Sequence, residues 1–86
     1  MYKYKILKSD GSSEEFSTEK LSLDSLQRHV GGFIQLLPNP SAFGIETDGD
    51  VYVNEDGKLL NLPANPHATI TDFDVLVGNI LIEEKI

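Results

Sequence analysis

The chain has 86 residues, of which 40% are hydrophobic and 24% charged, and its formal net charge is −7. This length and composition are typical of one small globular domain, so we expect residues 1–86 to fold as a single unit. The absence of cysteine excludes disulfides, thiolate metal sites and cysteine nucleophiles. The sequence shows neither a signal peptide nor the roughly 18 apolar residues of a membrane span, which favours a cytoplasmic protein without a membrane partner.

The negative charge is concentrated in the second part of the chain. Residues 1–30 contain five basic and five acidic side chains, whereas residues 31–86 contain two lysines and nine acidic side chains. Nucleic-acid binding depends on clustered Lys and Arg, so this distribution argues against a nucleic-acid partner. It would instead steer a basic protein surface toward residues 31–86.

The first thirty residues predict a hairpin followed by a helix. Residues 2–8 alternate in the manner of a half-exposed strand, and residues 14–16 favour a second strand after a turn at Gly11. Ser22 is a suitable N-cap for a helix, and Gly31-Gly32 is a suitable end, with one glycine at positive φ. The apolar stripe predicted to pack on the sheet consists of Leu23, Leu26 and Val30.

The remaining residues predict further strands and one short helix. Residues 33–37 and 51–53 have strand character, and residues 58–60 favour the return arm of a hairpin. Asn65 before Pro66 fits the start of a helix that ends near residue 70. Residues 75–82 are the most apolar stretch and predict a central strand, in which Gly78 indicates a bulge or a close backbone approach. A short extended segment is also expected at residues 42–46.

These elements predict an α+β fold. We expect a small, mostly antiparallel sheet of about five strands, packed with one main helix at about residues 22–30 and a short second helix at about residues 66–70.

No catalytic or metal-binding pattern is recognisable. Residues 48–56 are rich in acids, but neither Gly49 nor Gly57 can be position 6 of an EF-hand loop with an oxygen ligand at position 1. His29 and His67 lack the spacing of zinc ligands. The serines fall where turns and caps explain them, and the common nucleophile and phosphate-loop motifs are absent. We therefore predict no enzyme activity, no metal and no cofactor.

Residues 61–69 form the candidate ligand site. They gather amide, imidazole and hydroxyl groups around a proline-stiffened turn, where free backbone N–H groups at a helix start could receive a polar or anionic ligand. Because acids dominate this part of the chain, an anion would also need a basic residue from the first part. The alternative is that the asparagines only fix the turn. The candidate ligand-binding residues are Asn61, Asn65, His67, Thr69 and Arg28.

Several segments, in this order and spacing, resemble one family. They are Val30-Gly31-Gly32-Phe33-Ile34-Gln35, Val53-Asn54-Glu55-Asp56-Gly57-Lys58-Leu59, Leu62-Pro63 with Asn65, Ala68-Thr69, and Val77-Gly78-Asn79-Ile80. The chain thereby resembles the family catalogued as domain of unknown function 3846, which occurs in phage, bacterial, algal-virus and plant proteins. The resemblance implies a small accessory protein of a phage or mobile element, in the cytoplasm of the host cell. Members often carry a basic residue after the asparagine that matches Asn65, and Pro66-His67 departs from this pattern.

Three functions are compared as hypotheses. The first is a non-catalytic phage-type accessory protein that counteracts a host defence by holding a small polar, nucleotide-like ligand. The second is an acidic inhibitor that covers a basic surface of a host protein. The third is a regulatory module of a larger assembly. A domain of this size has little interior for a pocket, so a ligand site between the subunits of a homo-oligomer is also expected.

Overall fold

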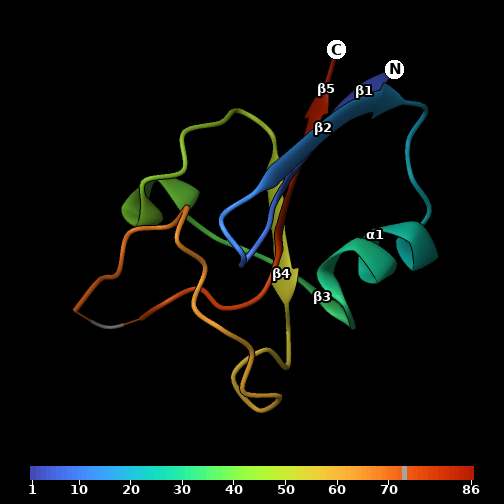
Figure 1. Cartoon of the computed structure of the whole chain (residues 1–86). Coiled ribbons are helices and arrows are strands. Elements are labelled where there is room, and N and C mark those ends of the chain that lie inside the picture. The colour runs from blue at the N-terminus through green and yellow to red at the C-terminus, as the bar shows by residue number, and fades with distance from the viewer. Residues whose placement is uncertain (73) are drawn as a thin grey trace.

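A computed structural model of the chain describes residues 1–72 and 74–86. Its described part contains one antiparallel sheet, one α-helix and one 3₁₀ helix (Figure 1). In chain order the elements are β1 (Tyr2–Leu7), β2 (Ser13–Thr18), α1 (Leu23–Val30), β3 (Ile34–Leu36), the 3₁₀ helix η1 (Pro40–Phe43), β4 (Asp50–Asn54) and β5 (Ile80–Lys85). This architecture confirms the predicted class of a small sheet with one main helix.

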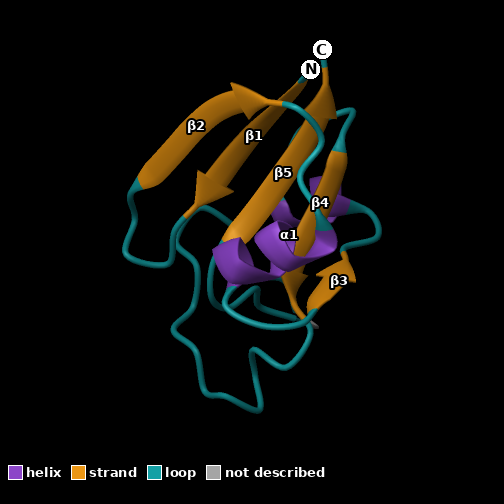
Figure 2. Cartoon of the chain, turned by 90° about the vertical axis from the view of Figure 1, so that its right-hand side faces the viewer, coloured by secondary structure: helices purple, strands orange, loops and turns teal. Residues whose placement is uncertain are grey.

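The five strands lie in the order β2-β1-β5-β4-β3, with β2 and β3 at the edges (Figure 2). The first and last strands of the chain are therefore neighbours in the sheet, and Tyr2 pairs with Lys85 while Leu7 pairs with Ile80. Both chain ends lie together, because the Ile86 N–H donates to the Met1 carbonyl at 3.1 Å. The turn predicted at Gly11 is present, and Gly11 has a φ of 93°.

Helix α1 follows its local signals closely. The Ser22 Oγ accepts a hydrogen bond from the Ser25 N–H at 3.2 Å, which is an N-cap. Gly31 has a φ of 83° and ends the helix in the left-handed conformation, as predicted. Leu26 and Val30 are buried, but Leu23 is 60% exposed. The predicted apolar stripe is therefore shorter, because Leu23 lies in the exposed first turn and only Leu26 and Val30 join the apolar cluster on this side of the sheet.

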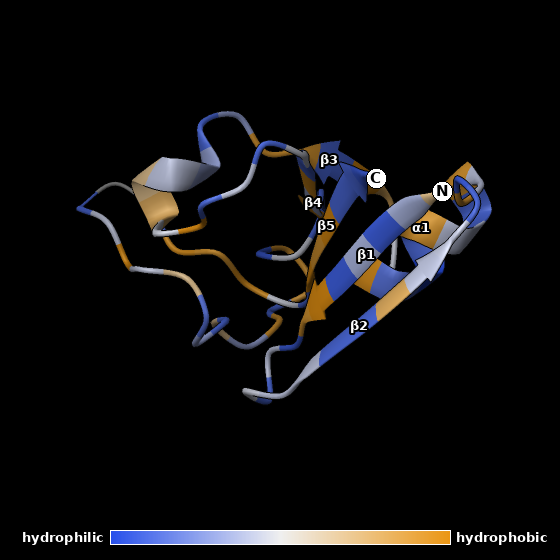
Figure 3. Cartoon of the chain, turned by 90° about the horizontal axis from the view of Figure 1, so that it is seen from above, coloured by the Kyte–Doolittle hydropathy of each residue, from blue (hydrophilic) through white to orange (hydrophobic). Residues whose placement is uncertain are grey.

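Each face of the sheet has its own apolar cluster. Strand residues alternate between faces, so Tyr4 and Ile6 lie toward α1 and Leu7 lies toward the opposite side. The α1 side is formed by Tyr4, Ile6, Leu26, Val30 and Leu81. The opposite side is formed by Leu7, Phe43, Ile45, Val51, Val53, Leu76, Ile80 and Ile82. Figures 1 and 3 show α1 and η1 on opposite sides of the sheet, so the domain has a helix layer, a sheet layer and a layer of irregular chain.

The second helix expected at residues 66–70 is absent. A single turn begins there, because the Ala68 N–H donates to the Asn65 carbonyl at 3.3 Å. The Thr69 N–H then donates to the Phe43 carbonyl at 2.8 Å, which prevents a further helical turn. The short helix of the fold is instead η1, whose last two residues overlap the extended segment expected at residues 42–46.

Two strand predictions also need correction. Residues 58–60 form turns, with the Leu60 N–H bound to the Asp56 carbonyl, because both edges of β4 are already occupied by β3 and β5. The last strand begins at Ile80 rather than at residue 75. Before it, Gly78 bends the chain with a φ of 73°, and a Cβ there would lie 2.8 Å from Leu62 Cδ1. The Gly78 N–H also donates to the Pro63 carbonyl at 2.8 Å, so another segment of backbone approaches closely here, as predicted.

Candidate functional site

Asn65, the central residue of the predicted ligand site, is 3% exposed and fully engaged inside the protein. Its Nδ2 donates to the Leu7 carbonyl at 2.7 Å and to the Gly78 carbonyl at 2.8 Å. Its Oδ1 accepts from the His67 N–H at 2.9 Å. Both amide protons and the amide oxygen are thus used, and the side chain joins three separate segments of the chain.

The other residues of that turn are also occupied or turned outward. The His67 Nε2 lies 3.0 Å from the Ser12 carbonyl, and the Thr69 N–H is bound to Phe43. Asn61 is exposed and takes a φ of 55°, a conformation that asparagine tolerates better than most residues. A ligand at this turn would therefore have to displace hydrogen bonds that hold the loops.

Arg28, the predicted basic partner of this turn, lies on the other side of the sheet. It belongs to α1, whereas residues 61–69 belong to the layer of irregular chain on the opposite side (Figure 1). Its Nη2 donates to the Ser25 Oγ at 3.0 Å. The structure does not bring the five predicted residues together.

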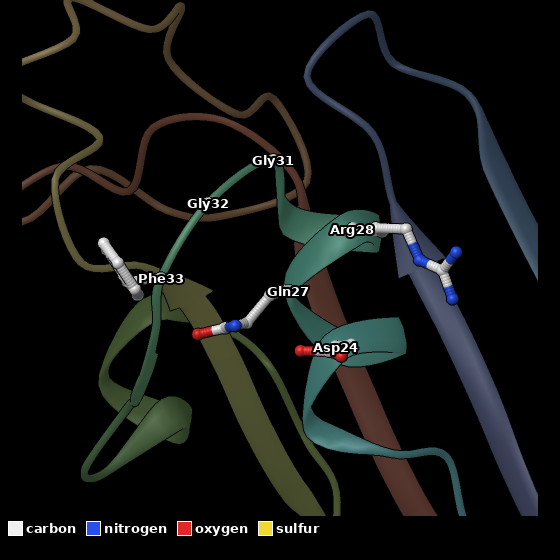
Figure 4. Close-up of a pocket in the computed structure, with 6 residues that line it drawn as sticks. All are labelled: Asp24, Gln27, Arg28, Gly31, Gly32 and Phe33. Atoms are coloured by element: carbon white, nitrogen blue, oxygen red, sulfur yellow. The ribbon is translucent and has the colours of Figure 1, made fainter.

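The structure contains a different hollow, at the junction of α1 and β3 (Figure 4). It has a volume of about 720 Å³ and is open to solvent. The helix contributes residues at i, i+3, i+4 and i+7, so one face of α1 forms one wall. The hollow is lined by Asp24, Gln27, Arg28, Gly31, Gly32 and Phe33. In Figure 4 the side chains of Asp24 and Gln27 extend toward the segment that carries Phe33, whereas the Arg28 guanidinium extends away.

Two asparagines fix the end of α1 beside this hollow. The last carbonyls of a helix have no partner within it, and here side-chain amides supply one. The Asn54 Nδ2 donates to the Val30 carbonyl at 3.3 Å, and the Asn79 Nδ2 donates to the His29 carbonyl at 3.3 Å. Asn54 also excludes a side chain at Gly32, because a Cβ there would lie 2.9 Å from its Nδ2. The two glycines therefore bring the chain from α1 into β3 within a short distance.

Phe33 is the most unusual residue of the hollow. Its carbonyl accepts a hydrogen bond from the Glu55 N–H at 2.8 Å, so its backbone is fixed against the chain that follows β4. Its side chain is nevertheless 65% exposed. Sequence reasoning missed this residue, because an apolar run of strand length predicts burial. The signal that could have found it is its place directly after two glycines, where the chain is still crossing from helix to sheet edge.

The polar side chains of the hollow come from α1. The hollow offers the Asp24 carboxylate and the Gln27 amide, whereas Arg28 lines it with the part of its side chain near the helix. Among residues 1–72 and 74–86, no cluster of three or more His, Asp or Glu side chains is placed to hold a metal ion.

A second polar cluster surrounds the buried acid Glu83, which is 4% exposed. The Tyr4 hydroxyl donates to its Oε2 at 2.7 Å, and the Lys20 Nζ lies 3.1 Å from its Oε1. The Tyr4 oxygen accepts from the Leu21 N–H at 2.8 Å. Burial raises the pKa of Tyr4, and the hydrogen bond to Glu83 raises the pKa of Lys20. This cluster ties the β2–α1 connection to the sheet.

A family model described as "Domain of unknown function (DUF3846)" matches residues 4–85. The chain belongs to this family. No curated protein and no solved structure matches it. Within the described ranges, no helix has the length and apolar character required to cross a membrane.

Membership of the family gives a structural meaning to the segments that resemble it. Asn54, Asn65 and Asn79 lie in three of those segments. All three use their side chains to bind backbone carbonyls of distant segments. The segment from Val30 to Gln35 contributes the two glycines and Phe33 to the hollow. The segments that resemble the family therefore include both the asparagines that tie distant parts of the chain together and part of the lining of the α1–β3 hollow.

Proposed function

We propose that this protein is a non-catalytic binding module that holds a polypeptide partner in the hollow between α1 and β3. The exposed ring of Phe33 is the observation that carries this proposal. Aromatic side chains are enriched at the centres of protein interfaces, where they contribute much of the binding energy. Here the backbone that carries the ring is held by hydrogen bonds, from the N–H groups of Gly31 and Gly32 to the Gln27 carbonyl and from the Glu55 N–H to the Phe33 carbonyl. Little conformational freedom of the backbone would therefore be lost on binding.

The openness of the hollow favours a polypeptide over a small molecule. Small-ligand sites are concave and bury about 70–90% of the ligand surface. This hollow is open along α1, and its lining ends at Phe33, the residue directly before the edge strand β3. The excess of acidic side chains in residues 31–86 supports a partner with a basic surface. These properties agree with the hypothesis of an acidic inhibitor that covers a host protein.

The second candidate is the small polar, nucleotide-like ligand. Phe33 and Gln27 support it, because an aromatic ring can stack on a base and an amide can pair with its edge. In that case the ligand occupies the α1–β3 hollow rather than residues 61–69. A role against a host defence fits either candidate and stays a prediction. A ligand site between the subunits of a homo-oligomer also stays a prediction.

Selection from a library of short displayed peptides tests the proposal. Peptides selected on the unmodified protein should bind the Phe33→Ser variant at least about tenfold more weakly, a loss of roughly 1.4 kcal/mol. The matched control is Ile70→Ser, which removes a similarly exposed apolar side chain from the other side of the sheet. Equal losses in both variants, or none in either, would place the site elsewhere.

A parallel thermal-shift measurement separates the two candidates. Common nucleotides should leave the melting temperature unchanged if the hollow binds a polypeptide. A rise that grows with nucleotide concentration and is lost in Phe33→Ser would establish the small-ligand function instead.

A further inference from the structure

The geometry points to the way in which the partner binds: we propose that it adds to the edge of β3 as a sixth strand, through an extended segment whose apolar residues are flanked by Lys or Arg. This inference rests on the proposed function and specifies its partner. Four observations lead to it, namely the hydrogen-bonding state of β3, its lack of charge, its apolar side chains and the acids around it.

The first observation is that β3 is paired along one edge only. Gln35 lies opposite Val53, the Glu55 N–H donates to the Phe33 carbonyl, and the Leu37 N–H donates to the Val51 carbonyl. In an antiparallel pair, alternate residues direct their N–H and C=O groups toward the partner strand. Ile34 and Leu36 therefore direct theirs to the opposite edge, where the described residues supply no further strand (Figure 2).

The second observation is the contrast with β2, the other edge. That strand carries Glu14 and Glu15, which lie 3.4 Å from Lys8 and 3.3 Å from Lys3. Charged side chains on an edge strand are a common protection against pairing with another chain. The segment from Phe33 to Leu37 has no charged residue, so β3 lacks this protection.

The third observation is that an added strand would meet apolar side chains. Ile34 packs against the apolar cluster beneath α1, and Leu36, two residues further, lies on the same face of the sheet. Leu36 is 55% exposed, so part of its surface is available for contact. Residues of the partner strand on this face would cover Leu36 and lie beside the wall that α1 provides. Main-chain bonds with alternating side-chain contacts are the usual form of strand addition.

The fourth observation concerns charge. Glu55 follows the end of β4 next to Phe33, and Asp50 begins β4 near the opposite end of β3. Asp24 lines the hollow from α1. Of the nearby cations, Lys58 is paired with Asp74. The Arg28 guanidinium is hydrogen-bonded only to the neutral Ser25 hydroxyl and keeps its charge, but it extends away from the hollow (Figure 4). Lys or Arg at both ends of the added strand would therefore lie roughly 10 Å, or two strand spacings, from acids on β4, where attraction acts through space rather than by contact.

The same charges argue against a second copy as the occupant. Antiparallel pairing of β3 with itself would place the Glu55 end of one copy at the Asp50 end of the other. Each copy also carries a net charge of −7, so association would bring like charges together.

The test uses synthetic peptides of alternating Val and Ser, flanked on each side by two lysines, with affinity measured by fluorescence anisotropy. Replacing the lysines with glutamates should weaken binding at least about tenfold, and added salt should weaken the lysine form. N-methylation of every second backbone nitrogen blocks the donors on one edge of the peptide. Two such peptides are compared, one methylated at the odd-numbered nitrogens and one at the even-numbered nitrogens. The peptide whose blocked edge faces β3 should lose at least about tenfold in affinity, and the other should bind nearly as before.

The protein variants are Leu36→Lys, which adds charge to the free edge, and Ser17→Lys as its control on the β2 edge. We expect Leu36→Lys to lose peptide binding and Ser17→Lys to keep it. If Phe33→Ser abolishes binding of library peptides but both N-methylated peptides bind fully, strand addition is wrong and the proposed function survives. Failure of every lysine-flanked peptide to bind also overturns the inference. Sedimentation of a dimer that Leu36→Lys dissociates would identify a second copy as the occupant instead.

Discussion

The two faces of the sheet are covered in different ways. On one face a single helix contributes Leu26 and Val30 to an apolar cluster, and its ends are fixed by local caps. On the other face the cover is irregular chain between β3 and β5, which includes η1. That cover is held by the buried Asn65 side chain as well as by apolar contacts. The cover on the helix side is therefore held by apolar residues that recur at helical spacing within one short segment. The cover on the irregular side is held in part by a few polar contacts between residues far apart in the sequence.

This difference explains where a binding surface can exist. The irregular side encloses its polar groups, and among the described residues every buried side-chain nitrogen and oxygen has a hydrogen-bond partner. The helix side covers the middle of the sheet but leaves β3 and Phe33 uncovered at its rim. The exposed surface thus arises because one short helix cannot cover the whole width of a five-stranded sheet.

The largest expected effect is that of Asn65→Ala on the irregular side. The change leaves the carbonyls of Leu7 and Gly78 and the N–H of His67 without their partner, and we expect the free energy of unfolding to fall by about 3–5 kcal/mol. Urea denaturation measures this loss. Asn61→Gly is the control, since its exposed side chain and positive φ predict a change within about 0.5 kcal/mol. Similar losses in both variants would show that Asn65 has no special role.

On the helix side, Leu26→Ala should cost about 2–4 kcal/mol, because it removes a buried side chain and leaves a cavity. Leu23→Ala should cost less than about 0.5 kcal/mol, since that side chain is mostly exposed. Chemical denaturation of the pair would show whether the stripe is as short as the structure indicates. A loss below about 0.5 kcal/mol for Leu26→Ala would contradict the packing of α1 on the sheet.

Tyr4→Phe should cost about 1–3 kcal/mol, because it leaves the Leu21 N–H and one oxygen of Glu83 without a partner. It should also change the response to alkali. Burial raises the pKa of Tyr4 above its ordinary value of 10.0, so the unfolded chain loses this proton first and stability falls as pH rises above that value. The raised pKa of Lys20 acts in the same direction. Stability of Tyr4→Phe, measured from pH 8 to 11, should therefore decline less steeply than that of the parent; an equal decline would rule Tyr4 out.

The smallest effect is expected at the surface pair of Lys58 and Asp74. The hydrogen bond from Lys58 lowers the pKa of Asp74 below its ordinary value of 3.8. Its contribution is therefore present above about pH 4 and is lost as the pH falls through the folded-state value. Exposure limits the contribution to about 0.5 kcal/mol, which Asp74→Asn should remove at pH 7 and not at pH 2. Asp72→Asn makes the same charge change nearby and serves as the control at both pH values.

The elements that the sequence predicted correctly are those defined by neighbouring residues. Helix α1 has its N-cap, its apolar residues and its final glycine within a dozen positions. The second helix failed because Thr69 binds the distant Phe43 carbonyl, which no local pattern indicates. The hairpin arm at residues 58–60 failed because the neighbours of β4 depend on the whole topology.

The candidate site was also predictable only in part, because local sequence signals do not show which distant segments meet. Arg28 was expected near a ligand and does line the hollow, although on the opposite side of the sheet from the turn it was expected to serve. Asn65 has the same residue type whether it binds a ligand or a carbonyl 58 positions away, so its role could not be read from the sequence. Phe33 was predicted only as part of a strand at residues 33–37, because apolar character does not reveal which strand ends at an uncovered rim.

The position of β5 in the sheet has a consequence for how the molecule is made. This strand is the last element in the chain, yet it lies between β1 and β4 and joins the two parts of the sheet. During synthesis the β1–β2 hairpin and α1 leave the ribosome early, but their apolar faces have no central strand to complete them. Contacts between the first and last strands also raise the mean sequence separation, which slows folding. The domain therefore acquires its native sheet only when residues 80–85 emerge, and a chain truncated before β5 would lack a core rather than form a smaller domain.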